Sequence, residues 1–354
     1  NHPKALIIGL DGPILTDAER LLLVKGNPLG IILFARNCKS PDQLRALTGE
    51  VRTLLGRADA PILIDYEGGR VRQLCDPVWP VFPAAALYGE IYARDPKRAV
   101  RMVRRAYRLV GQMLADVGID VDCAPVLDLP TPGAHDVIGR RAFASDPDRI
   151  AAMAGAACAG LLDAGVLPVV KHIPGHGRAL ADSHKALPVV DTDAATLEKT
   201  DFVPFRALCR APWGMTAHIL YSAFDNALPA TISPTVVGDV IRRQIGFDGL
   251  LVSDDLDMKA LSGSHEKKAL AMLAAGVDIV LHCSGDTDAA SRLVTVVPPI
   301  GPETAARLVR GQAMRMMRQK PPVDFARAYS RLMTEMAGYT HHDPTNPDVG
   351  YHPD

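Results

Sequence analysis

The stretch LPVVKHIPGHGRALADSH at residues 167–184 combines a short apolar run with a long polar loop, and this unit identifies the class of fold. Residues 167–173 form a largely apolar run, which is typical of a parallel strand buried on both faces. Polar side chains begin where this run ends. Pro174, Gly175 and Gly177 then prevent a helix from starting at once, so a long loop is expected after the strand.

The same unit, a short apolar run followed by a longer amphipathic segment, recurs along the chain. Strands are predicted at 5–10, 30–35, 61–66, 119–127, 167–173, 213–219, 249–254 and 278–283. Helices are predicted at 41–55, 96–117, 147–164, 194–210, 234–245 and 265–275, with two more helical stretches after the last strand. Several of them start with Ser or Asp before Pro, a pattern favoured at helix N-termini, at Ser40, Asp95, Asp146 and Ser233.

Eight strand–helix units predict an α/β fold, a closed parallel (β/α)₈ barrel of the TIM type with a long catalytic loop after the fifth strand. An open nucleotide-binding sheet is disfavoured because no Gly-rich fingerprint follows an early strand. Residues 1–339 are expected to form one catalytic barrel domain. The polar tail at 340–354 is expected to be extended or disordered, and its three histidines are a weak candidate for adventitious metal binding.

Composition excludes several kinds of partner. The 354-residue chain has a formal net charge of −1, so it offers no long-range field for nucleic acid or an anionic membrane. It has no apolar run of the roughly 18 residues that a membrane span needs. Its 6 cysteines contain no C-x-x-C pair, which favours buried free thiols in a reducing compartment. We therefore expect a cytoplasmic monomer that binds a small molecule rather than nucleic acid or a membrane.

Polar residues gather where the predicted strands end, and active sites of such barrels lie at the C-terminal strand ends. These residues are Asp65 after strand three, Lys171 and His172 in strand five, His218 in strand six and Asp254 in strand seven. His172 and His176 are spaced like a helical zinc pair, but Pro174 and Gly175 remove the helical register. No metal site and no cofactor are predicted.

Asp182 lies two residues before His184, close enough in a tight turn to orient one ring nitrogen and leave the other for substrate. Ser183 is a neighbour of both and no G-x-S-x-G motif is present, so serine-nucleophile chemistry is disfavoured.

A carboxylate such as Asp254 at a strand end is suited to attack an anomeric carbon. The alternative is a structural ion pair between Asp254 and Lys171 or Arg141. Asp254 and Asp255 should point to opposite faces of the strand and not form an acid pair. Asp257 is interpreted as a cap for the next helix.

The sequence resembles family 3 glycoside hydrolases, in particular the bacterial β-N-acetylglucosaminidases of peptidoglycan recycling. The resemblance extends over about residues 5–335 and is carried by GIILFARN (30–37), DYEGGRVR (65–72), APVLDL (124–129), VIGRRAF (137–143), KHIPGHG with DSH (171–184), MTAHILY (215–221) and VSDDLDM (252–258). It implies a retaining mechanism with Asp254 as nucleophile and His184 as acid/base, supported by Asp182. It also implies that Asp65, Arg141, Lys171 and His172 hold the sugar.

The sequence departs from the family pattern at two places near strand three. Gln73 stands where the family often has an arginine, and Tyr66 stands where it often has a glutamine. Arg72 is the candidate to replace the missing arginine, so Arg72, Gln73 and His218 complete the predicted substrate-binding set.

The resemblance implies an exo-acting, cytoplasmic enzyme that removes β-linked N-acetylglucosamine from N-acetylglucosaminyl-anhydro-muramyl peptides. A phosphorylase of the same family is an alternative, because a neutral histidine tolerates an incoming phosphate. A sugar-binding barrel without catalysis is another. A mechanism that uses the substrate's own acetamido group is disfavoured because Asp254 and Asp255 should diverge.

Overall fold

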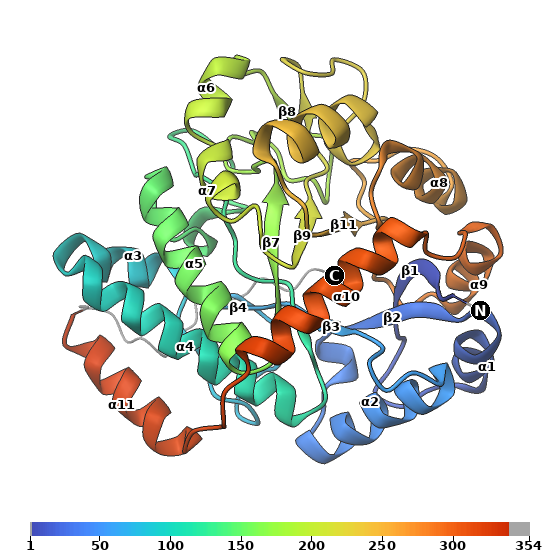
Figure 1. Ribbon diagram of the computed structural model, residues 1–354, viewed down its shortest axis with the longest axis horizontal. Coiled ribbons are helices and arrows are strands. Elements are labelled where there is room, and N and C mark those ends of the chain that lie inside the picture. The colour runs from blue at the N-terminus through green and yellow to red at the C-terminus, as the bar shows by residue number, and fades with distance from the viewer. Residues whose placement is uncertain (1, 340–354) are drawn as a thin grey trace.

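The computed structural model describes residues 2–339, and these form a closed barrel of parallel strands surrounded by helices (Figure 1). In barrel order the strands are β1 (Lys4–Gly9), β2 (Pro28–Leu33), β3 (Ile62–Ile64), β6 (Val121–Asp122), β7 (Leu167–Ile173), β9 (Trp213–Thr216), β11 (Leu250–Asp255) and β12 (Ile279–His282). Each overlaps one predicted run, and β12 pairs with β1 to close the ring. The predicted (β/α)₈ barrel is confirmed.

The helices lie outside the barrel. They are α1 (Asp17–Gly26), α2 (Pro41–Leu55), α3 (Ala85–Arg94), α4 (Pro96–Asp116), α5 (Pro147–Asp163), α6 (Ala194–Lys199), α7 (Phe202–Ala207), η4 (Val236–Ile245), α8 (His265–Ala275), α9 (Thr287–Val296), α10 (Pro302–Arg318) and α11 (Phe325–Ala337). In Figure 1, α11 lies beside α4, and Glu335 on α11 pairs with Arg98 and Arg105 on α4. No helix within residues 2–339 is long and apolar enough to span a membrane.

The predicted helix starts are mostly confirmed by capping bonds. Ser40, Asp95 and Asp146 each accept a hydrogen bond from the backbone N–H three residues later. Ser233 precedes helix η4 and accepts a bond from the N–H of Val236. These side chains satisfy N–H groups that the helix itself leaves unpaired.

Two helix predictions need correction. The helix expected at 194–210 is two helices, α6 and α7, separated at Thr200–Asp201. The break lets Asp201 pair with Arg178 of the loop after β7. Three helices (α9, α10 and α11), not two, follow the last strand. The predicted tail at 340–354 lies outside the described residues.

Two short strand pairs shape the loops at the C-terminal end of the barrel. Directly after β3, β4 (Tyr66–Gly68) pairs with β5 (Val71–Arg72). The long loop after β7 contains β8 (Val189–Val190), which pairs with β10 (Leu220–Tyr221) in the loop after β9. The loops after β3, β7 and β9 are therefore held by backbone hydrogen bonds and not by side chains alone.

A buried carboxylate, that of Asp278, joins the barrel to its helices near the N-terminal ends of β11 and β12. Asp278 accepts hydrogen bonds from Arg242 on η4, from Thr304 and Arg307 on α10, and from the backbone N–H of Leu251. Because four donors surround one carboxylate, its charge is well compensated despite burial.

We expect Asp278→Ala to lower the free energy of unfolding by about 3–5 kcal/mol, because it leaves two guanidinium groups without their buried partner. The matched control is Glu303→Ala, which removes an exposed partner of the same Arg307. Chemical denaturation should show a much smaller loss for this control. Equal losses in the two variants would contradict the assignment of Asp278 as the tie between barrel and helices.

Candidate active site

Asp254 occupies the end of β11 at the mouth of the barrel. Burial alone would raise the pKa of its carboxyl, but interactions with His172, His218 and His184 lower that pKa to about 2. These three histidines come from β7 and from the loops after β7 and β9. Asp254 is therefore ionised at neutral pH and surrounded by imidazoles, as an attacking carboxylate requires.

Asp254 and Asp255 diverge, as the strand geometry predicts. The N–H of Asp255 donates to Asp254 Oδ1, whereas Asp255 Oδ1 accepts from the N–H groups of Asp257 and Cys283. Burial, with repulsion from Asp257 and Asp254, raises the pKa of Asp255 to about 7. The two adjacent carboxyls thus have different environments.

The predicted dyad is present on the long loop after β7. His184 Nδ1 lies 2.8 Å from Asp182 Oδ1, and the His184 N–H also donates to that oxygen at 3.0 Å. A carboxylate only accepts, so Nδ1 carries the proton of this hydrogen bond. The Asp182 side chain is buried, but that of His184 is 43% exposed. A half-exposed imidazole held by a buried carboxylate suits proton transfer at an open mouth.

The residue between them anchors the dyad loop at two points. The Ser183 hydroxyl lies 3.1 Å from Nε2 of His176, and the Ser183 carbonyl accepts from the N–H of Ala260. Burial and the neighbouring His172 lower the pKa of His176 to about 4, so its ring is neutral. His176 therefore acts as a hydrogen-bonding support, and Ser183 is engaged in holding the loop.

His172 is oriented by Asp128, which sequence reasoning missed as a functional residue. Asp128 Oδ2 accepts from His172 Nδ1 at 2.7 Å, and its Oδ1 accepts from the N–H groups of His172 and His176. Although burial opposes ionisation, these contacts lower the pKa of Asp128. Within residues 2–339, Nε2 of His172 has no hydrogen-bond partner, so this atom can contact a ligand. The signal was the aspartate inside the apolar stretch APVLDL, since a buried carboxylate needs partners.

A buried charge cluster occupies the mouth between β3, β7 and η2 (Gly139–Arg141). Lys171 Nζ lies 2.7 Å from both Asp65 Oδ1 and Glu67 Oε1. Arg141 makes two parallel bonds of 2.8 Å to the carboxylate of Glu67. The structure thus brings together three predicted sugar-binding residues through Glu67, which the prediction did not include.

Glu67, Lys171 and Arg141 are all ionised in this cluster. Burial would raise the pKa of Glu67 and lower those of Lys171 and Arg141. The opposite charges reverse each effect, so the pKa of Glu67 is lowered and those of the two cations are raised.

The remaining predicted contacts have protein partners of their own. Arg72 donates to the Gly69 carbonyl and to Asp76, and Gln73 Oε1 accepts from the N–H of Ala35. His218 is fully buried: Nε2 donates to the Asp255 carbonyl at 2.9 Å and Nδ1 lies 2.7 Å from the Thr231 hydroxyl. His218 therefore holds the end of β11, next to Asp254. Sugar contacts by these residues stay predictions.

Asp257 is not the cap of helix α8. Ser264 has that role, accepting from the N–H of Lys267. Asp257 instead pairs with His265 and His282.

Comparison with known proteins agrees with this architecture. The glycosyl hydrolase family 3 N-terminal domain matches residues 11–316. The chain belongs to glycosyl hydrolase family 3. It is therefore a glycoside hydrolase, and the resemblance seen in the sequence is confirmed.

Individual relatives match over nearly the whole chain. A beta-hexosaminidase of Alkalilimnicola ehrlichii is 40% identical over 331 residues, 92% of either chain. The solved structure of NagZ from Neisseria gonorrhoeae in complex with N-trifluoroacetyl-D-glucosamine has a TM-score of 0.84 at 31% identity, covering 95% of this chain and 98% of that one. A family 3 beta-N-acetylglucosaminidase from Paenibacillus gives a TM-score of 0.81 at 30% identity, covering 94% and 67%.

We expect Glu67→Gln to lower the free energy of unfolding by about 3–5 kcal/mol, because it leaves Lys171 and Arg141 buried with too little negative charge. Glu90→Gln is the matched control, since Glu90 pairs with Arg140 at the surface. Chemical denaturation should show a much smaller loss of unfolding free energy for Glu90→Gln, because exposed ion pairs contribute little to stability. A Glu67→Gln protein as stable as the control would show that the charge cluster does not need this carboxylate.

Proposed function

We propose that the protein is a retaining exo-β-N-acetylglucosaminidase in which Asp254 is the nucleophile and His184, oriented by Asp182, is the acid/base. The observation that carries the proposal is the combination of an ionised, partly buried Asp254 with an oriented imidazole on a neighbouring loop. The names of the relatives support the class of sugar.

In the first step, a carboxylate oxygen of Asp254 attacks the anomeric carbon and the glycosidic C–O bond breaks. The proton on His184 Nε2 passes to the departing oxygen, leaving a glycosyl ester on Asp254. In the second step His184 Nε2 takes a proton from water, whose oxygen attacks the anomeric carbon and displaces Asp254. Two inversions give net retention.

Asp182 supports both steps without touching the sugar. Its carboxylate accepts from His184 Nδ1, so it fixes the ring orientation and stabilises the imidazolium that donates its proton in the first step and forms again in the second.

The sugar is held by the polar residues of the mouth. Asp65 and Arg141 offer directional hydrogen bonds from the charge cluster, and His172 offers its free Nε2. Lys171 is buried, with 3% of its side chain exposed, so it acts chiefly by holding Asp65 and Glu67 in place. For the natural substrate we propose N-acetylglucosaminyl-anhydro-muramyl peptides, cleaved in the cytoplasm by a monomer during peptidoglycan recycling.

Release of chromophore from an aryl β-N-acetylglucosaminide tests the proposal. Wild type should turn over without phosphate. Asp254→Ala should lose at least about 10⁴-fold in kcat, because no glycosyl ester can form. His184→Ala should lose about 10²–10⁴-fold, the usual contribution of acid–base catalysis.

Other outcomes would replace the proposal. Turnover that requires phosphate and yields a sugar 1-phosphate would identify a phosphorylase. Absence of turnover on both this substrate and the aryl glucoside would identify a sugar-binding barrel. Full activity in Asp254→Ala would point to the acetamido group of the substrate as nucleophile.

The role of Asp182 predicts a shift in the pH profile of kcat/KM. Because Asp182→Asn removes the charge that stabilises protonated His184, the alkaline limb should move to lower pH. Asp191→Asn, an exposed carboxylate farther along the same loop, is the control and should leave both limbs in place. An unchanged alkaline limb in Asp182→Asn would contradict the dyad.

A further inference from the structure

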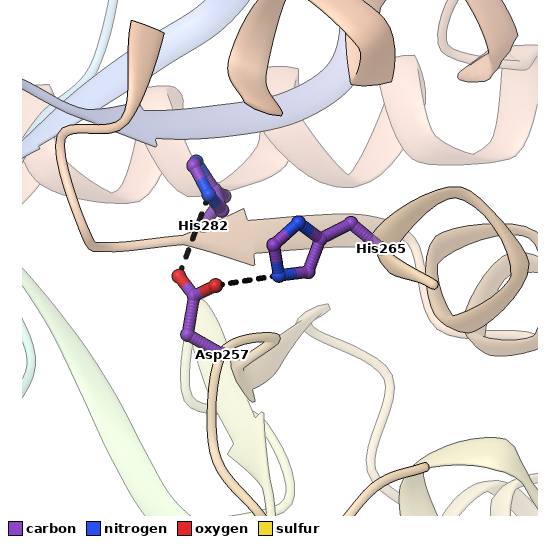
Figure 2. A group of neighbouring side chains, drawn as sticks. All are labelled: Asp257, His265 and His282. Carbon is purple, nitrogen blue, oxygen red and sulfur yellow. Dashed lines mark ion pairs between the residues drawn. The ribbon is translucent and has the colours of Figure 1, made fainter. Parts of the chain in front are cut away.

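Asp257, His265 and His282 converge beside the last two barrel strands, outside the catalytic constellation (Figure 2). Asp257 Oδ1 lies 2.8 Å from His265 Nε2, and Asp257 Oδ2 lies 3.4 Å from His282 Nε2. The rings of the two histidines are 5.5 Å apart at an interplanar angle of 64°. One donor atom from each residue therefore lies within 4.8 Å of the other two.

The cluster is assembled from three separate segments that the fold fixes. Asp257 follows β11, His265 is the first residue of helix α8, and His282 is the last residue of β12. Asp255 fixes two of these segments, because its carboxylate accepts from the N–H of Asp257 and from the N–H of Cys283, next to His282. The three side chains are thus placed by backbone contacts and not only by their mutual attraction.

The cluster leaves polar atoms without hydrogen bonds. Asp257 Oδ2 and His282 Nδ1 are buried and lack a hydrogen-bond partner among the described residues. The His282 side chain is fully buried, and the other two are about three-quarters buried. Unpaired buried polar atoms are rare in folded proteins, and an ion bound between the three side chains would satisfy Asp257 Oδ2.

We propose that Asp257, His265 and His282 form a binding site for a divalent transition-metal ion of the Zn²⁺ class. Two imidazole nitrogens and one carboxylate oxygen are a donor set that suits Zn²⁺ and its neighbours. Mg²⁺ and Ca²⁺ prefer oxygen donors and are disfavoured.

The spacing of the donors fits such an ion. Metal–ligand bonds of about 2.0–2.1 Å in tetrahedral geometry place neighbouring donors about 3.3 Å apart. The 3.4 Å between Asp257 Oδ2 and His282 Nε2 already meets this. Asp257 Oδ1, which lies 2.8 Å from His265 Nε2, is the second oxygen of the same carboxylate, and one donor atom from each of the three residues lies within 4.8 Å of the other two. Water or the Ser284 hydroxyl, 3.1 Å from His282 Nε2, completes the coordination.

The ion would join β11, α8 and β12 at the barrel rim. None of the three ligands belongs to the dyad loop after β7, and none is one of the proposed catalytic residues. The test of the site measures metal binding, so it does not require activity.

The test measures Zn²⁺ affinity by competition with a chromophoric chelator, and coordination by the visible absorption of the Co²⁺ form. In the parent protein and in all variants, the tail histidines His341, His342 and His352 are replaced by Gln, so that the tail cannot bind the metal ion. His265→Gln is the main variant because a partly exposed residue in a first helical turn can be replaced without disturbing the core. Asp257→Asn is the second variant, with His2→Gln as the exposed-histidine control and His184→Gln as the active-site control.

We expect one Zn²⁺ to bind the parent protein at this site and to raise its Tm. His265→Gln and Asp257→Asn should each weaken this affinity by at least about 10–100-fold and remove both the Tm shift and the Co²⁺ absorption of a low-coordinate site. His2→Gln and His184→Gln should retain them. Unchanged affinity in His265→Gln and Asp257→Asn, or loss of all binding in His184→Gln, would overturn the proposal.

Discussion

The barrel mouth depends on one buried cation, the ammonium group of Lys171, held between the carboxylates of Asp65 and Glu67. An ammonium group with only 3% of its side chain exposed is stable only if opposite charges replace its lost hydration. Glu67 can remain a charged partner of Lys171 although it is buried, because Arg141 also pairs with the same carboxylate through two parallel bonds. Strand β7, the hairpin after β3 and the segment around Arg141 are thus locked together, and any ligand in the mouth meets fixed charges.

At the end of β11, two strands from β7 in the barrel, two adjacent carboxyl groups differ because their neighbours differ. Imidazoles from three segments lower the pKa of Asp254 to about 2, whereas burial and like charges raise that of Asp255 to about 7. The strand pleat makes this possible because it turns adjacent side chains to different surroundings. His218 also positions Asp254, since its ring donates a hydrogen bond to the Asp255 carbonyl and so fixes the end of β11.

The barrel could be predicted from sequence because its signals are local. Continuous apolar runs mark the strands, and Ser or Asp before Pro marks the helix starts at Ser40, Asp95 and Asp146. The predictions of helix boundaries failed where contacts with distant residues determine the structure. The helix expected at 194–210 breaks because Asp201 turns inward to pair with Arg178, a partner that helical periodicity does not reveal.

The same distinction between local and distant contacts separates the site residues that sequence reasoning found from those it missed. Asp182 and His184 are two residues apart, so a single turn brings them together and the motif alone predicts the bond. Glu67 meets Arg141 across 74 residues and Asp128 meets His172 across 44, and only the closed barrel brings these pairs together. Both carboxylates stand in quoted motifs, yet their function is to orient other side chains, which a motif cannot state. A sequence does show where a charge would be buried at a cost in free energy. A carboxylate at the end of an apolar strand therefore requires a partner. In a parallel barrel that partner is to be sought at the ends of the neighbouring strands.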